Sequence, residues 1–125
     1  MSESTDQDGR GLIAVEAAIR VADASRRDEI VRASVPIQQS TRDDEPGCVV
    51  YCFAADPCEP DLIQVYELWQ DEASLAAHFD HPNYTAMREM LNAAGLASAV
   101  SRKFLVAAAA PVYGSDRRPT AAFRT

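Results

Sequence analysis

A chain of 125 residues in which 47% of the side chains are apolar has the size and composition of a single globular domain. The net charge of −7 argues against nucleic acid as a partner, because phosphates call for a basic surface. No apolar run is long enough to cross a membrane, and the acidic start lacks the apolar core of a signal peptide, so we expect a cytoplasmic protein.

The first third of the chain predicts a strand followed by a helix. Residues 1–10 are polar and are expected to be disordered, whereas Leu12 to Arg20 alternates between apolar and mixed positions, which is typical of a strand. Asp23 can cap the helix that follows. Pro36 lies inside this helix, where proline costs about 3 kcal/mol, so we expect a kink or a break near Val35. The inward stripe is predicted to be Ile30, Ala33, Ser34 and Ile37.

A charged turn from Thr41 to Gly47 precedes a second strand, Cys48 to Ala54. Both faces of this strand are apolar, so neither should face bulk water. One face is predicted to carry Val49, Tyr51 and Phe53, and the other Cys48, Val50 and Cys52. The α-carbons of Cys48 and Cys52 would lie about 13 Å apart, beyond the ~7 Å limit for a disulfide, so we expect free thiols. The spacing of the cysteines and histidines also indicates no metal site.

The third strand starts at Leu62 and leads directly into a helix. Asp71 is placed to cap that helix. Alternation puts Leu62, Gln64, Tyr66 and Leu68 on one strand face, and Ile63, Val65, Glu67 and Trp69 on the other. On the helix, the 3.6-residue period puts Leu75, His78 and Phe79 on one side. A strand–helix corner therefore collects polar and aromatic groups that could perform chemistry.

Pro82 suits the first turn of a last helix, and Gly95 is placed to end it. Its apolar stripe is Tyr84, Met87, Met90, Leu91 and Ala94. A final strand covers roughly Ser98 to Ala108, and residues 111–125 are an arm or a tail. The order β-α-β-β-α-β predicts an α+β, ferredoxin-like domain over residues 11–110, with helices on one face of a four-stranded antiparallel sheet. Since the second strand is apolar on both faces, a second copy is expected to cover the open face, giving a homodimer.

His78 is the leading candidate for a catalytic base, because imidazole titrates near neutral pH. Glu67 could orient His78 or bond a substrate hydroxyl, and Trp69 could form the floor of a pocket for a flat aromatic molecule. The other candidate binding residues are Tyr51, Tyr66, Phe53, Phe79 and Arg88. Each has a structural alternative: a buried His bonded to a backbone carbonyl or to Glu67, aromatic core packing, and a solvated Arg on a helix face.

Several short segments occur in a recognisable order. They are Glu45-Pro46-Gly47-Cys48 before a strand with Tyr51, then Glu67-x-Trp69, Asp71-Glu72, Leu75-x-x-His78 and His81-Pro82. This order resembles the antibiotic biosynthesis monooxygenase domain family over roughly Leu12 to Val106. The resemblance implies a dimeric α/β barrel and a cofactor-independent oxidation of a quinol or polyketide phenol by O2. In that chemistry His78 would be the base, Glu67 would orient it, and Trp69, Tyr51 and Tyr66 would be the walls.

Two alternative functions follow from the same residues. Relatives that degrade haem use an Asn on the first strand and a His on the last helix. Here the first strand offers Glu16 or Ala17, and Met87-Arg88 stands where the His would be expected, so the haem alternative is the weaker one. A non-catalytic, small-molecule-binding or stress-associated dimer is compatible with everything in the sequence.

Overall fold

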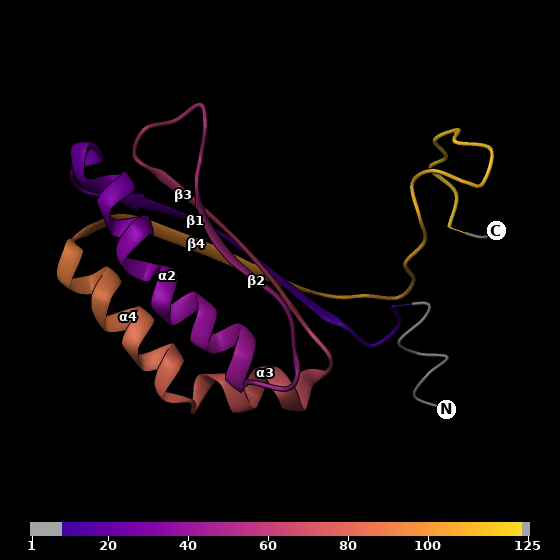
Figure 1. Cartoon of the computed structure of the whole chain (residues 1–125), viewed down its shortest axis with the longest axis horizontal. Helices are drawn as coiled ribbons and strands as arrows, with labels where there is room; N and C mark the ends of the chain where they lie inside the picture. The colour runs from indigo at the N-terminus through magenta and orange to yellow at the C-terminus, as the bar shows by residue number, and fades with distance from the viewer. Residues whose placement is uncertain (1–8, 124–125) are drawn as a thin grey trace.

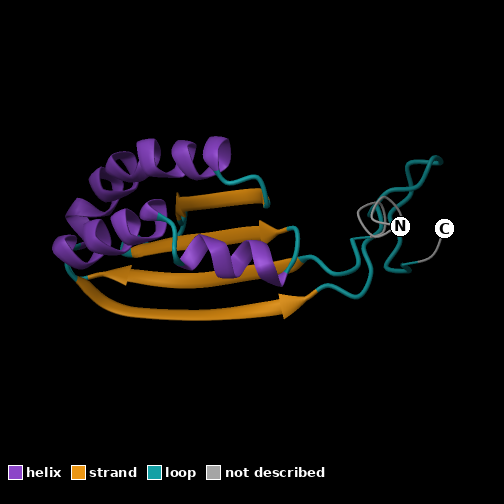
Figure 2. Ribbon diagram, turned by 90° about the horizontal axis from the view of Figure 1, so that it is seen from below, coloured by secondary structure: helices purple, strands orange, loops and turns teal. Residues whose placement is uncertain are grey.

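The computed structural model describes residues 9–123 as one sheet covered on one face by helices (Figures 1 and 2). The elements in chain order are β1 (Ile13–Val21), the short 3-10 helix η1 (Ala24–Arg26), α2 (Arg27–Asp44), β2 (Cys48–Ala55), β3 (Leu62–Trp69), α3 (Glu72–Phe79), α4 (Pro82–Ala94) and β4 (Leu96–Leu105). The strand order is β2-β3-β1-β4, and all neighbours are antiparallel. The predicted α+β, ferredoxin-like fold is confirmed.

The core lies between the sheet and the helices. Its strand side chains come from one set of alternate positions on each strand, including Ile13, Ile19, Ile63, Val65 and Trp69. β4 forms one edge of the sheet, and none of the helices in residues 9–123 covers it (Figure 2). Nine of its ten residues are exposed as a result. The helix layer is therefore narrower than the sheet, which leaves room for a cleft beside β4.

β2 contains a bulge at Val49. Cys48 pairs with Trp69 and Val50 pairs with Leu68, so Val49 is an extra residue between two pairs that are consecutive on β3. The bulge turns Cys48 toward the core and leaves Val49 54% exposed. The prediction that Val49 shares a face with Tyr51 and Phe53 is wrong, because strict alternation does not hold across an extra residue.

The helix after β1 begins in η1, where the Asp23 carboxylate accepts the N–H of Ser25 at 3.0 Å. The buried face of α2 is more polar than predicted. Gln38 and Thr41 are buried on it, and Ala33 is exposed. Both ends of the Gln38 amide bond the backbone of Phe53 on β2, so this polar side chain is satisfied inside the core.

α2 runs without interruption through Pro36, so it is not broken near Val35. Proline has no N–H for the carbonyl of Arg32, one turn earlier. Both Pro36 and Arg32 are exposed, so water can reach that carbonyl. The helix also extends to Asp44, which means that the predicted charged turn starts four residues later than expected.

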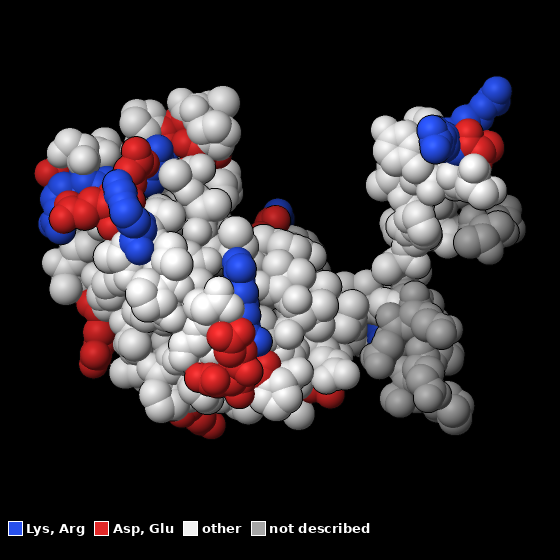
Figure 3. All heavy atoms as spheres, viewed as in Figure 1, with Lys and Arg blue, Asp and Glu red and all other residues white. Residues whose placement is uncertain are grey.

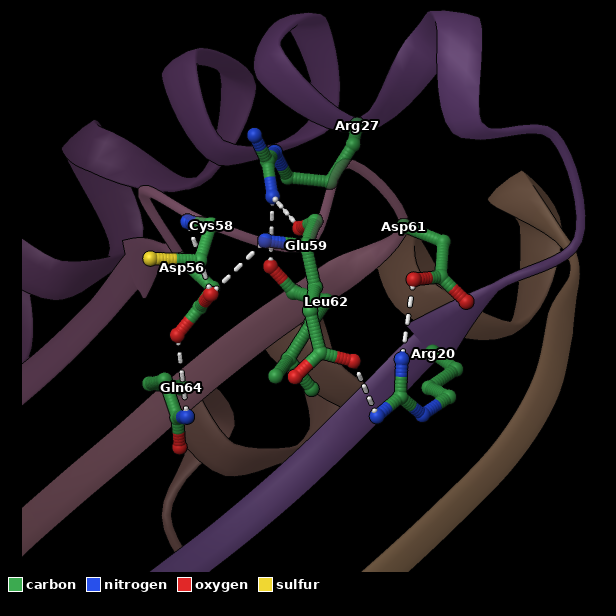
Figure 4. Close-up of polar contacts among 8 residues, drawn as sticks. All are labelled: Arg20, Arg27, Asp56, Cys58, Glu59, Asp61, Leu62 and Gln64. Carbon is green, nitrogen blue, oxygen red and sulfur yellow. Dashed lines mark hydrogen bonds and ion pairs between the residues drawn. The ribbon is translucent and has the colours of Figure 1, made fainter.

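Charged side chains hold the β2–β3 loop (Figure 4), which lies at the end of the sheet opposite to α3 (Figure 1). Arg20 of β1 pairs with Glu59 at 2.7 Å and with Asp61 at 2.9 Å. Arg27 of α2 donates to the carbonyl oxygens of Glu59 and Leu62 at 2.9 and 2.7 Å. Figure 3 shows charged atoms of both signs gathered where α2 begins. This end of the molecule is held by polar contacts and is distant from the strand–helix corner.

After β4 the chain leaves the sheet and runs away from the helices (Figure 1). A small turn forms there, in which Thr120 N–H bonds the carbonyl of Val112 at 2.8 Å and Tyr113 bridges to Pro119. Residues 1–8 and 124–125 lie outside the described residues. Most of the segment predicted to be disordered, residues 1–10, is therefore not described. Within residues 9–123, no helix is both long and apolar enough to cross a membrane.

Candidate functional site

A cleft of about 570 Å³ lies between the sheet and the last two helices. The helix-facing side of β1 and β4 forms one wall, and α3 and α4 form the other. The β4 residues that line the cleft are exposed except for Leu96, so the cleft opens to solvent along that edge. Six of the eight predicted site residues line the cleft, and they are Tyr51, Phe53, Glu67, His78, Phe79 and Arg88.

His78 lies at the buried end of this cleft and is only 1% exposed. Its Nδ1 is 2.8 Å from Oε1 of Glu45, which is also buried. The second oxygen of Glu45 accepts the Asn83 side-chain amide at 3.0 Å. Since a carboxylate can only accept hydrogen bonds, Glu45 assigns the proton of the neutral imidazole to Nδ1. Nε2 then keeps the lone pair that a base requires.

The expectation that Glu67 orients His78 is corrected by this contact. Oε1 of Glu67 accepts the indole N–H of Trp69 at 2.9 Å. Burial is the main cause that raises the pKa of the Glu67 carboxyl, while the bond from Trp69 and the charge of His78 act in the opposite direction. Glu67 still lines the cleft and can hydrogen-bond a ligand there, but Glu45 holds the imidazole.

Local sequence explains how Glu45 reaches His78 from 33 residues away. Glu45 ends α2 in an extended conformation, which the following Pro46 favours because its ring excludes a helical residue before it. Gly47 then packs against α3: a Cβ at this position would lie 2.1 Å from the Ser74 hydroxyl oxygen. Only a glycine lets the turn approach α3 closely enough to bring the Glu45 carboxylate beneath His78.

The start of α3 is fixed by Asp71, whose carboxylate accepts the Ser74 N–H at 2.8 Å as predicted. α4 begins at Pro82 and ends before Gly95, whose φ of +89° suits glycine, also as predicted. His81 caps α4 by accepting the Asn83 N–H at 3.0 Å. The two helices that carry the cleft wall therefore have defined ends.

Aromatic rings surround His78 on several sides. The ring of Trp69 is 4.5 Å away between centroids, and those of Tyr51 and Tyr84 are each 5.5 Å away in edge-to-face geometry. Burial, followed by the charges of Glu67 and Glu45, raises the pKa of the Tyr51 phenol, so Tyr51 stays protonated at neutral pH. Aromatic rings therefore surround the Glu45–His78 pair at this end of the cleft.

Two predicted binding residues do not line the cleft. Trp69 is 0% exposed and lies behind His78, so it supports the imidazole and cannot form the floor of the cleft. Tyr66 is on the opposite, open face of the sheet, where it is 47% exposed. Phe79 lines the cleft but is half-exposed, so it does not belong to the buried stripe with Leu75 and His78.

Sequence reasoning missed Glu45, Asn83, Tyr84 and Lys103 as site residues. Glu45 carried one usable signal, an acidic residue directly before Pro-Gly at the end of a predicted helix. Nothing local indicated that it would meet His78. The part of the chain that the structure describes contains no group of three or more metal-ligating side chains. The three cysteines in it are free, and burial raises the pKa of the Cys48 thiol to about 11.

Comparison with known proteins places this architecture in a family. The model of the family described as antibiotic biosynthesis monooxygenase matches residues 12–90. The chain belongs to the antibiotic biosynthesis monooxygenase family. The matched range includes every residue of the strand–helix corner and ends just before the last turn of α4.

Solved structures of similar proteins share the fold of this family member. One from Caulobacter crescentus CB15, assigned to the antibiotic biosynthesis monooxygenases, is 19% identical with a TM-score of 0.70, covering 83% of this chain and 97% of its own. A conserved protein of unknown function from Bacteroides thetaiotaomicron VPI-5482 is 22% identical with a TM-score of 0.66, covering 76% and 97%. At these identities the likeness concerns the fold alone.

A sequence relative adds no reaction. An uncharacterised protein from Synechocystis is 30% identical over 86 residues, which are 66% of this chain. The match spans 57% of the length of that relative. Family membership therefore suggests a monooxygenase, while the reaction and substrate of this chain have to be argued from its own site.

Proposed function

We propose that this protein is a cofactor-independent monooxygenase that oxidises a small, electron-rich aromatic compound, a quinol or a polyketide phenol, with O2. The observation that carries the proposal is the buried Glu45–His78 pair at the inner end of an aromatic-lined cleft. Family membership supports the reaction class. Glu45 holds Nδ1–H, and Nε2 of His78 is the base that takes the phenolic proton.

The protein's share of the chemistry is proton removal and the exclusion of water. The phenolate that forms is a stronger reductant than the phenol, and it gives an electron to O2. Recombination of the resulting radicals adds oxygen to the ring; one oxygen atom stays in the product and the other leaves as water. The substrate thus supplies all the electrons. The rings of Tyr51, Trp69 and Tyr84 exclude water from reactive intermediates.

The test is oxygen uptake by the purified protein on a panel of quinols and polycyclic phenols. His78→Asn keeps a donor for Glu45 and removes the base, so uptake should fall by about 100-fold or more. Glu45→Gln removes the acceptor that selects the tautomer of His78, so uptake should fall and its pH profile should change shape. Binding of the same substrate should persist in both variants, measured under nitrogen.

The control is Glu89→Gln, because Glu89 is exposed on α4 and does not line the cleft. This variant should retain uptake. Equal uptake by native protein and His78→Asn would remove His78 from the base role. Ligand-dependent thermal stabilisation without uptake on any compound would favour the non-catalytic binding function.

The protein is further proposed to work as a homodimer through the open face of the sheet. Large apolar side chains are exposed on that face, including Tyr66, Val100 and Phe104. A monomer would leave them in water, whereas a second copy of the same sheet would bury them under two-fold symmetry. Sheet-to-sheet packing of this kind would give the dimeric α/β barrel that the family resemblance implies.

A further inference from the structure

The outer part of the cleft is basic, although the whole chain carries a net charge of −7. Arg88, Arg102 and Lys103 lie along it, and Glu67, at the inner end, is the one acidic residue among the described residues that line the cleft. Arg102 is already paired with Glu16 and lies over the ring of Phe104. Arg88 and Lys103 are the two cations of the cleft that could bind a ligand.

Arg88 stands at the border of the apolar stripe of α4. Met87 and Leu91 are buried in the middle of that stripe. At 100° per residue, Arg88 and Asn92 fall on the edge that borders the cleft, and Met90 falls on the other edge, where it packs against the core. Arg88 is exposed and lines the cleft.

Lys103 faces the same space from the sheet. It pairs with Val15 of β1, which pairs with Glu67 of β3, which pairs with Tyr51 of β2. Residues directly opposite one another in a sheet share a face, so all four point toward the helix side. Lys103 thus lies in the same row as Glu67, displaced from it by two strands.

Neither cation is neutralised by another side chain of the described residues. Within residues 9–123, Arg88 and Lys103 have no hydrogen-bond or ion-pair partner, whereas Arg20, Arg26, Arg27 and Arg102 each pair with a carboxylate. The two free cations come from opposite walls, α4 and β4, at the open side of one cleft. Two cations that line one cleft and lack an acidic partner among the described residues form a place for an anionic group of a ligand.

We propose that the ligand of this cleft is an aromatic acid, bound with its ring system between the sheet and α4, its phenol toward His78, and its carboxylate between Arg88 and Lys103. This inference rests on the proposed function only in using the same cleft, and it names the substrate class of that site. Arg88 and Lys103 are then the residues that determine specificity for an acidic substrate.

The dimensions suit a two-ring aromatic. Lys103 and Glu67 are two strands apart, which corresponds to about 10 Å at the usual spacing of strands. A naphthalene with a hydroxyl at one end and a carboxylate at the other covers such a distance. The apolar wall between the two ends is formed by Val15, Ala17, Met87 and Leu91.

The test compares binding of 6-hydroxy-2-naphthoate with binding of its neutral isostere, 6-hydroxy-2-naphthamide, by titration calorimetry under nitrogen. The native protein should bind the carboxylate about tenfold more tightly than the amide, and added salt should reduce this preference. Arg88→Gln and Lys103→Gln should each weaken carboxylate binding about fivefold and leave amide binding unchanged. Arg32→Gln is the matched control, since it removes one positive charge from an exposed position on α2 outside the cleft.

Equal affinities for acid and amide would overturn the proposal, as would a loss of carboxylate binding in Arg32→Gln as large as in the two cleft variants. Binding of neither compound at millimolar concentration would also overturn it. The readout needs no turnover, so its failure is separate from failure of the oxygen-uptake experiment. A clear preference for the acid without oxygen uptake would keep this inference and remove the proposed reaction.

Discussion

Two buried glutamates near one histidine have different tasks in this protein. Glu45 accepts from His78, and Glu67 accepts from Trp69. From sequence alone Glu67 was the natural choice as the partner of His78, because it precedes the Trp on the same strand face and lies only eleven positions from the histidine. Glu45 is the actual partner because Pro46 and Gly47 redirect the chain beneath α3. Proximity along the chain was the wrong criterion for the contact.

The raised pKa of Glu67 predicts how stability depends on pH. Between the ordinary value near 4.5 and the raised value, the folded protein holds a proton that the unfolded chain has lost. The free energy of unfolding therefore falls as pH rises through this interval, and above it the full cost of a buried carboxylate is present. Glu67→Gln keeps an acceptor for Trp69 and cannot ionise, so it should be more stable than the native protein at pH 8.

Chemical denaturation of both proteins at pH 4 and pH 8 measures this effect. Below pH 4.5 Glu67 is protonated in both states, so the advantage of Glu67→Gln should shrink there. Glu89→Gln is the control for loss of one charge, because Glu89 is exposed on α4. An advantage of the same size at both pH values would show that Glu67 is not destabilised by ionisation.

At the scale of elements, local sequence signals determine where the helices begin and end, whereas packing determines irregularities within an element. The caps at Asp71 and Gly95 and the start at Pro82 are where the sequence places them, because a cap involves residues within one turn. The bulge at Val49 and the continuous helix through Pro36 are not visible in those signals. They depend on how β2 pairs with β3 and on which side of α2 faces water.

Replacing Pro36 by Ala should stabilise the protein by about 1–2 kcal/mol. The substitution restores an N–H for the carbonyl of Arg32 in the middle of α2, and part of that gain is offset because the unfolded chain becomes more flexible. Urea denaturation with Pro57→Ala as a control separates the two effects, since Pro57 is in the exposed β2–β3 loop. A gain no larger than that of Pro57→Ala would mean that proline is already well accommodated in this helix.

At the scale of the whole molecule, the helix layer leaves two surfaces of the sheet uncovered. One is the helix side of β4, where the cleft opens, and the other is the entire open face. The first has cations at its border and suits a small acidic ligand. The second has large apolar side chains and suits a second copy of the chain. The proposed activity and the proposed assembly thus use different sides of one sheet.

Val100→Asp places a charge on the open face and should convert the proposed dimer into a monomer in sedimentation experiments, because a buried, unpaired carboxylate opposes association. Val35→Asp is the control, since Val35 is similarly exposed but lies on α2. Its sedimentation should match that of the native protein. A native protein that sediments as a single 13.6 kDa chain at micromolar concentration would contradict the dimer.

The sequence by itself determined the class of fold and the order of the elements. It also determined, for most elements, which residues share a face. Alternation with period two separated the buried side of β3 from its exposed side, and the stripe of α4 was correctly identified. The same alternation already put Tyr66 on the face opposite Trp69, so those two residues could not both be walls of one cleft. These features are local, because a strand or helix sets them over a few residues.

Only the tertiary structure decided which side chains meet. The Glu45–His78 bond joins a helix end to another helix, and Arg88 and Lys103 line one cleft from a helix and from a strand. Trp69 was sealed behind His78 by packing of α3 on the sheet. Contacts between residues far apart in the chain depend on the angle and distance at which whole elements pack, and no period within a single element encodes those.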